Sequence, residues 1–148
     1  SLYFMKDLEA AGSVADVRSI SQKMIEHVTT LFNAEVKPKD LVRLISYLND
    51  LIIVKIIKIL TEKTFTDLPG RFAFLVLGSE GRMEQTLRTD QDNAMVYGDG
   101  LSGKEIEVLE EFSVRLIDAL VDIGFPSCPG GKPRFRGGTM PVDGEMPR

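Results

Sequence analysis

The sequence predicts an α/β (α+β) fold in which an N-terminal helical segment precedes a core that contains a sheet. Up to residue 66, apolar side chains recur every three or four positions, which is the period of helices packed along one face. Two short apolar runs, residues 72–77 and 93–97, then have the length and composition of buried strands. We therefore expect a helical segment over residues 1–66, a core over residues 67–131 and an irregular tail over residues 132–148.

Two long helices are expected in the N-terminal segment, after a short helical lead-in over residues 2–11. Ser13 is the expected N-cap of the first, with Asp16 three residues further on. Pro38 lies in the first turn of the second, where its missing N–H costs nothing. The wide apolar face of this second helix predicts burial on more than one side. The inward positions are expected to be Val14, Val17, Ile20, Met24, Val28, Leu31 and Phe32 in the first helix and Leu41, Leu44, Ile45, Leu48, Leu51, Ile52, Ile56, Ile57 and Leu60 in the second.

Turn residues and caps delimit the core. Residues 64–70 end in Pro69-Gly70 and are interpreted as a loop and domain boundary. Ser102 with Glu105 forms an S-x-x-E capping box, and Gly124 ends the helix that follows. The inward positions of that helix are expected to be Ile106, Leu109, Phe112, Leu116, Leu120 and Ile123.

The composition narrows the class of protein. The chain has 148 residues, of which 43% are hydrophobic and 27% charged, as in a soluble globular domain. No apolar run approaches the roughly 20 residues of a membrane span. One cysteine, Cys128, allows no intrachain disulfide and favours a cytoplasmic protein. One histidine, His27, lies off the centre of its helical stripe, and we interpret it as a surface or boundary residue rather than a catalytic one. Because the chain starts with Ser1 rather than Met, we expect it to be a piece of a longer protein.

The net charge of −4 is unevenly distributed. Residues 1–70 carry nine basic and nine acidic side chains, residues 71–131 carry five and eleven, and residues 132–148 carry four and two. An acidic middle argues against a broad nucleic-acid face, which needs clustered positive charge. It suits a site for a cation.

The first candidate site lies where the strand over residues 72–77 runs into Gly78-Ser79. Glycine permits a close approach of phosphate to the backbone, and the free N–H groups of a turn and a helix start favour an anion. Ser79 adds a hydroxyl donor. Gly-Ser turns are common, and the chain has no G-x-x-x-x-G-K-[ST] phosphate-binding loop. Arg82 has two interpretations, a phosphate clamp or an ion-pair partner for a nearby carboxylate such as Glu80 or Glu84.

Asp90 and Asp92 supply two carboxylates at the start of the second strand. Residues i and i+2 of an extended segment project to one face, so their oxygens are expected side by side. Mg²⁺ prefers such oxygen ligands together with substrate phosphates. An Asp-x-Asp pair is more often a turn or a solvated face. The interpretation as a turn or a solvated face is weakened here, because the pair opens a strand about ten residues after the Gly-Ser turn.

These residues resemble a known family. The stretch GSEGRMEQTL, residues 78–87, and the stretch TDQDNA, residues 89–94, are similar to the GSxGRxEQTL…TDQDNA signature of a bacterial nucleotidyltransferase family first catalogued as a domain of unknown function. That family is related to the amino-terminal domain of the uridylyltransferase that modifies the PII signalling protein. Both belong to the DNA polymerase beta-like superfamily. The resemblance extends from the second helix to Gly131.

The resemblance implies a mixed sheet flanked by helices. It implies that Gly78 and Ser79 hold a nucleoside triphosphate and that Asp90 and Asp92 are catalytic residues that bind Mg²⁺. It also implies regulatory domains upstream of this segment in the full-length protein and a helical domain downstream.

One departure concerns the base. The superfamily uses a third carboxylate on a later strand, whereas the run Lys132-Pro133-Arg134-Phe135-Arg136 follows Gly131 directly, and the carboxylates left downstream are Asp143 and Glu145.

The function expected from the sequence is transfer of a nucleoside monophosphate from a triphosphate to an acceptor hydroxyl, with release of pyrophosphate. By analogy with the PII-modifying relatives, the acceptor is a side chain of a signalling protein. Two alternatives remain. One is a regulatory module that senses a nucleotide without catalysis, and the other is an interaction scaffold built on the Leu/Ile-rich helices.

Overall fold

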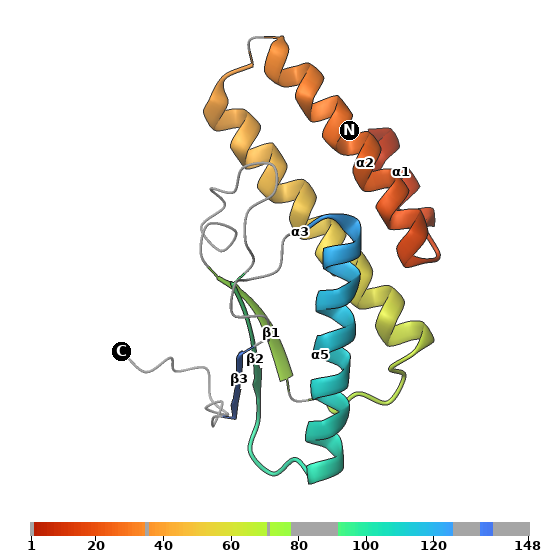
Figure 1. Cartoon of the computed structure of the whole chain (residues 1–148), viewed down its shortest axis with the longest axis vertical. Coiled ribbons are helices and arrows are strands. Elements are labelled where there is room, and N and C mark those ends of the chain that lie inside the picture. The colour runs from red at the N-terminus through yellow and green to blue at the C-terminus, as the bar shows by residue number, and fades with distance from the viewer. Residues whose placement is uncertain (1, 35, 71, 78–91, 126–133, 138–148) are drawn as a thin grey trace.

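The computed structural model describes residues 2–34, 36–70, 72–77, 92–125 and 134–137. They form an α/β arrangement of helices beside a small sheet, which confirms the predicted fold class. Figure 1 shows the sheet next to α5, with α1 and α2 on the side of α3 away from the sheet. In chain order the elements are α1 (Leu2–Ala10), α2 (Val14–Asn33), α3 (Pro38–Lys63), β1 (Phe72–Leu77), β2 (Asp92–Tyr97), α5 (Gly103–Ile123) and β3 (Arg134–Gly137).

The predicted helix boundaries are confirmed because their causes are local. The Ser13 Oγ accepts a hydrogen bond from the Asp16 N–H at 3.1 Å and caps α2. At the start of α5 the capping box is complete. The Ser102 Oγ accepts from the Glu105 N–H at 3.2 Å, and the Glu105 carboxylate accepts from the Ser102 N–H at 2.7 Å. Gly124 ends α5 with φ of 112°, a left-handed conformation that glycine adopts without a Cβ penalty.

The sheet is mixed, with strand order β1-β2-β3. β1 and β2 are antiparallel, and their ladder runs from Phe72 opposite Tyr97 to Leu77 opposite Asp92. β2 and β3 are parallel, from Ala94 beside Arg134 to Tyr97 beside Gly137. A parallel pair needs a crossover connection, usually a helix, and α5 lies between these two strands in the chain. β3 was not predicted, because its residues were expected to belong to an irregular tail.

The core is built mainly where α2, α3 and α5 pack together. Phe112 of α5 is fully buried, and its ring contacts those of Phe65 and Phe72 edge to face, with centroids 5.4 and 5.9 Å apart. The first strand is thereby attached to the helices at its first residue. Among the described residues, four that are polar are also buried, Ser21, Ser46, Asn49 and Ser113.

The predicted inward positions are largely confirmed. Val17, Met24 and Val28 of α2 are buried, as are all of the predicted positions of α5 except Ile106, which is partly exposed. Phe32 is a correction, since it is 67% exposed. It lies in the last turn of α2, where its neighbour Leu31 packs on the core instead.

In α3 the prediction of burial on more than one side is confirmed. Ile53 and Ile59 are buried in addition to the predicted inward positions, so most of the apolar surface of α3 packs against other parts of the chain. Val54, which is 62% exposed, and Tyr47, which is 44% exposed, are the exceptions. In the described part of the chain, no helix is both long and apolar enough to cross a membrane.

Candidate functional site

The last pair of the β1–β2 ladder joins the residue before the predicted phosphate turn to the predicted metal ligand Asp92. Leu77, the last residue of β1, stands opposite Asp92, the first residue of β2. Residues paired across an antiparallel ladder have Cα atoms about 4.5–5.5 Å apart. Gly78 and Ser79 follow Leu77 in the sequence, and Asp90 lies two residues before Asp92. Two strands therefore meet at one end of the hairpin. One leads to the predicted phosphate turn, and the other begins at the predicted metal ligand.

Of the five predicted site residues, the structure describes the backbone position of Asp92. The strand that it opens was predicted from residue 93 and begins one residue earlier. Gly78, Ser79, Arg82 and Asp90 lie outside the described residues. Residues 78–84, which the sequence predicts to turn into a short helix, also lie outside them. The downstream candidates Asp143 and Glu145 also lie outside them. The described residues add no further side chain to the predicted set.

The ladder end is positioned by the core below it. On one face of the hairpin, Phe74 stands opposite the fully buried Met95, and Phe72 opposite Tyr97, and all four pack into the core. On the opposite face, Leu75 is 41% exposed. One face of the hairpin is thus fixed on the helices, and that attachment sets the position of the Leu77–Asp92 pair.

β3 bears directly on the expected third carboxylate. It is the strand that follows α5, and it lies beside β2 from Ala94 to Tyr97. Its four residues, Arg-Phe-Arg-Gly, include neither Asp nor Glu. A third metal ligand or base at this strand is therefore excluded for residues 134–137.

The electrostatics of the described residues put no other site forward. The described portion contains no group of three or more His, Cys, Asp or Glu side chains that could hold a metal ion. His27 is exposed on α2, as expected. The pKa of Asp16 lies below its ordinary value of 3.8, because its carboxylate is hydrogen-bonded first by the Ser13 side chain and then by the Gly12 N–H. Asp16 lies at the α1–α2 junction, where this shift reflects helix capping.

A helical segment followed by a hairpin and a crossover helix beside a mixed sheet is the architecture expected of a nucleotidyltransferase-type domain. The family described as "Putative nucleotidyltransferase DUF294" matches residues 22–133, well over half of the chain. The chain therefore belongs to this family. The match includes Gly78, Ser79, Arg82, Asp90 and Asp92 and stops before β3. No curated protein and no solved structure matches the chain.

Proposed function

We propose that the chain is a nucleotidyltransferase domain that transfers a nucleoside monophosphate from a triphosphate to an acceptor hydroxyl. The family supports the class of enzyme. The observation that supports the place of the reaction is the pairing of Leu77 with Asp92 at the end of the hairpin. It joins the strand before Gly78-Ser79 to the strand that starts at the second aspartate.

In the proposed site, Gly78 and Ser79 bind the triphosphate through turn N–H groups and the Ser79 hydroxyl. Arg82 clamps a phosphate oxygen. Asp90 and Asp92 fit a Mg²⁺ site, because Mg²⁺ takes one or two carboxylates together with substrate phosphates. Magnesium bound there would neutralise charge on the phosphates of the substrate and of the leaving group.

The acceptor oxygen forms a bond to the α-phosphorus, and the bond from that phosphorus to the bridging oxygen of the β-phosphate breaks. Pyrophosphate leaves, and the hydroxyl proton passes to a base. We propose a side chain of a signalling protein as the acceptor, and the single cysteine of the chain supports a cytoplasmic setting.

The composition of β3 favours a second candidate function. A nucleotide-sensing module needs the phosphate turn and the metal ligands but no base. The strand that follows α5 has no carboxylate to act as one. In this alternative, the chain binds a triphosphate with Mg²⁺ and signals its presence without transfer.

The two functions are separated by measuring binding and transfer on the same samples. The full-length protein is incubated with α-labelled triphosphates, Mg²⁺ and cell extract, and the label is followed into acceptors. Transfer supports the enzyme. Tight nucleotide binding with no transfer under any triphosphate supports the sensor.

The metal assignment is tested by Asp92→Asn, with Asp99→Asn as the matched control. Asp99 is an exposed aspartate in the turn after β2. Asp92→Asn is expected to abolish Mg²⁺-dependent nucleotide binding, and Asp99→Asn is expected to leave it unchanged. Equal binding by the Asp92 variant and the wild type would remove Asp92 from the site.

A further inference from the structure

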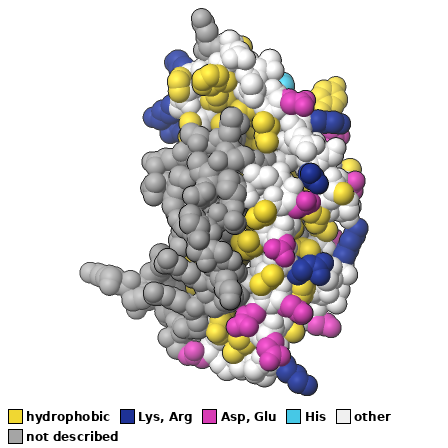
Figure 2. Space-filling view, viewed as in Figure 1, with side chains coloured by type: hydrophobic (Ala, Val, Ile, Leu, Met, Phe, Trp, Pro, Cys, Tyr) yellow, Lys and Arg dark blue, Asp and Glu magenta, His cyan; other side chains and the backbone are white. Residues whose placement is uncertain are grey.

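The surface of α5 that points away from the core combines negative charge with exposed apolar side chains. Figure 2 shows hydrophobic and acidic side chains intermingled over this helix. Val114 is 48% exposed and Val121 is 44% exposed, although both belong to a helix whose opposite side is fully buried. At 100° per residue they fall on one side of α5 together with four exposed carboxylates. We call this surface the outward face of α5, and it consists of Glu107, Glu110, Glu111, Val114, Asp118 and Val121.

The charges of this face are not balanced within the described part of the chain. Ion pairs there join Arg18 to Asp122 and Lys58 to Glu62, and neither includes a carboxylate of the outward face. The basic residues of α5, Lys104 and Arg115, lie at the edge of the face by helical geometry. The face therefore presents four negative charges along about three turns of helix.

Two features of this face are unfavourable for an isolated helix. Glu107 has like-charged neighbours at i+3 and i+4, and such pairs cost about 0.2–0.5 kcal/mol each. Val114 and Val121 are β-branched, so on an exposed surface they give less helix stability than Ala or Leu and expose apolar area. Neither valine belongs to the buried core, which α5 reaches through Leu109, Phe112 and Leu116. Local rules broken together on one face indicate a use outside the chain.

We propose that the outward face of α5 is a docking surface for a basic amphipathic helix of a partner protein. The valines are seven residues apart, two turns of helix, which is the repeat of apolar seams between packed helices. The carboxylates around them complement Lys and Arg beside the apolar stripe of the partner. A nucleic acid or an anionic membrane would be repelled by the same charges.

A second copy of this chain does not supply that partner among the described helices. Large exposed apolar groups also lie on the other helices, Tyr3 and Met5 on α1, Phe32 on α2, and Tyr47 and Val54 on α3. Neither α1, with Lys6 against Asp7 and Glu9, nor α2, with Arg18 and Lys23 against Asp16 and Glu26, carries an excess of positive charge. α3 has five basic and three acidic side chains, but Lys55 and Lys63 donate to carbonyl oxygens at and just beyond the end of α1. That leaves three basic and three acidic side chains along the rest of the helix: Lys39, Arg43, Lys58, Asp40, Asp50 and Glu62. The outward face of α5 would gain no net charge attraction from it. The proposal does not depend on the transfer reaction, because none of these residues belongs to the proposed nucleotide site.

The test uses the whole 148-residue chain and a labelled peptide of Lys and Leu, about five helical turns long, with Leu at i, i+3, i+4 and i+7. Fluorescence anisotropy measures its binding, and a scrambled peptide of the same composition is the reference. Saturable binding of the patterned peptide alone is expected. The double substitution Val114→Thr with Val121→Thr, which keeps shape and β-branching, is expected to weaken binding about tenfold. Glu111→Lys is expected to weaken it by a similar factor and to slow association most at low salt.

Matched controls carry the same changes elsewhere. Val54→Thr on α3 and Glu26→Lys on α2 alter exposed residues of other helices and are expected to leave binding unchanged. Circular dichroism verifies that each variant keeps its helical content. Equal binding of the scrambled peptide, or equal weakening by the control variants, overturns the proposal. The proposal is also overturned if the chain alone forms a dimer and the double substitution Val114→Thr with Val121→Thr makes that dimer dissociate, since the face would then join two copies.

Discussion

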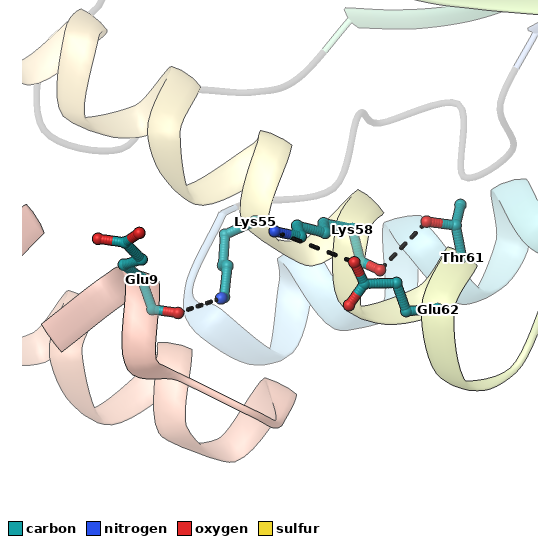
Figure 3. Close-up of polar contacts among 5 residues, drawn as sticks. All are labelled: Glu9, Lys55, Lys58, Thr61 and Glu62. Atoms are coloured by element: carbon teal, nitrogen blue, oxygen red, sulfur yellow. Dashed lines mark hydrogen bonds and ion pairs between the residues drawn. The ribbon is translucent and has the colours of Figure 1, made fainter. Parts of the chain in front are cut away.

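The ammonium group of Lys63, at the end of α3, donates a hydrogen bond to the carbonyl oxygen of Gly12, just beyond the end of α1. A second lysine of α3 acts in the same way about two turns earlier, where the Lys55 Nζ donates to the Glu9 carbonyl oxygen at 2.7 Å (Figure 3). Helices leave their last carbonyl groups without intrahelical partners, and cations near a helix C-terminus are favoured by its dipole. Two lysines of α3 thus attach the C-terminal end of a nine-residue helix to the rest of the chain.

Removing one of these attachments should destabilise the chain modestly. Lys63→Met keeps most of the apolar stem and loses the donor, and we expect the free energy of unfolding to fall by about 0.5–1.5 kcal/mol. Urea denaturation followed by circular dichroism measures it. The control is Lys58→Met, whose ion pair with Glu62 joins two largely exposed side chains and is worth little. Equal effects of the two substitutions would mean that the Gly12 contact contributes nothing specific.

The Asp16 carboxylate should make stability depend on pH in the acid range. Its pKa is lowered in the folded chain by hydrogen bonds from the Ser13 side chain and then the Gly12 N–H. The stabilisation is therefore complete above the ordinary value of 3.8 and is lost as the pH falls through the lower, folded-state pKa. Asp16→Asn should lower stability at pH 6, and its difference from the wild type should shrink below about pH 4. Thermal melts across this range test it, and a difference that grows in acid would contradict it.

The capping box of α5 should carry a measurable share of stability. Ser102→Ala removes the oxygen that accepts from the Glu105 N–H, and loss of such a cap costs about 1 kcal/mol. Chemical denaturation gives the value. Ser19→Ala, at an exposed position inside α2, is the control and should be neutral or slightly stabilising because Ala is the better helix former. A Ser102 variant as stable as this control would show that the cap is dispensable.

Phe112 should be among the most sensitive positions of the chain. It is fully buried and contacts the rings of Phe65 and Phe72, so Phe112→Ala should cost about 3–5 kcal/mol through lost burial and the cavity left behind. The same substitution at Phe32, which is 67% exposed, should change stability by less than about 0.5 kcal/mol. Differential scanning calorimetry of both variants makes the comparison. A small loss at Phe112 would mean that the core can collapse around the deletion.

The sequence predicts this fold best where the cause of a structural feature is local. Ser13 with Asp16, Ser102 with Glu105 and the terminating Gly124 are confirmed because each interaction closes within a few residues. The predicted burial of Phe32 is wrong, because an apolar stripe on a helix does not show where the element that packs against it ends. β3 was missed because its pairing with β2 joins segments 40 residues apart, Ala94 with Arg134, and a four-residue strand between Pro and Gly is too short for its alternation to be recognised.

For the candidate site too, the sequence predicts local features, whereas the pairing of distant segments comes from the structure. Residue types and spacing nominate Gly78, Ser79, Arg82, Asp90 and Asp92, and family membership covers all five. Their individual roles stay predictions. The register that places Asp92 opposite Leu77 needed the structure, since fourteen residues separate the two strands and any register over that span is compatible with the sequence.

The parallel pairing of β2 with β3 has a consequence for the order of assembly. The β1–β2 hairpin closes over a short span, whereas β3 pairs with β2 only after the chain has passed through the 21 residues of α5. Longer loops cost more entropy to close, so contacts of this kind form late in folding. We expect stopped-flow folding experiments to find the hairpin and the Phe112 contacts in the transition state and the β2–β3 ladder after it. The strand that completes the sheet would then be the last described element to dock.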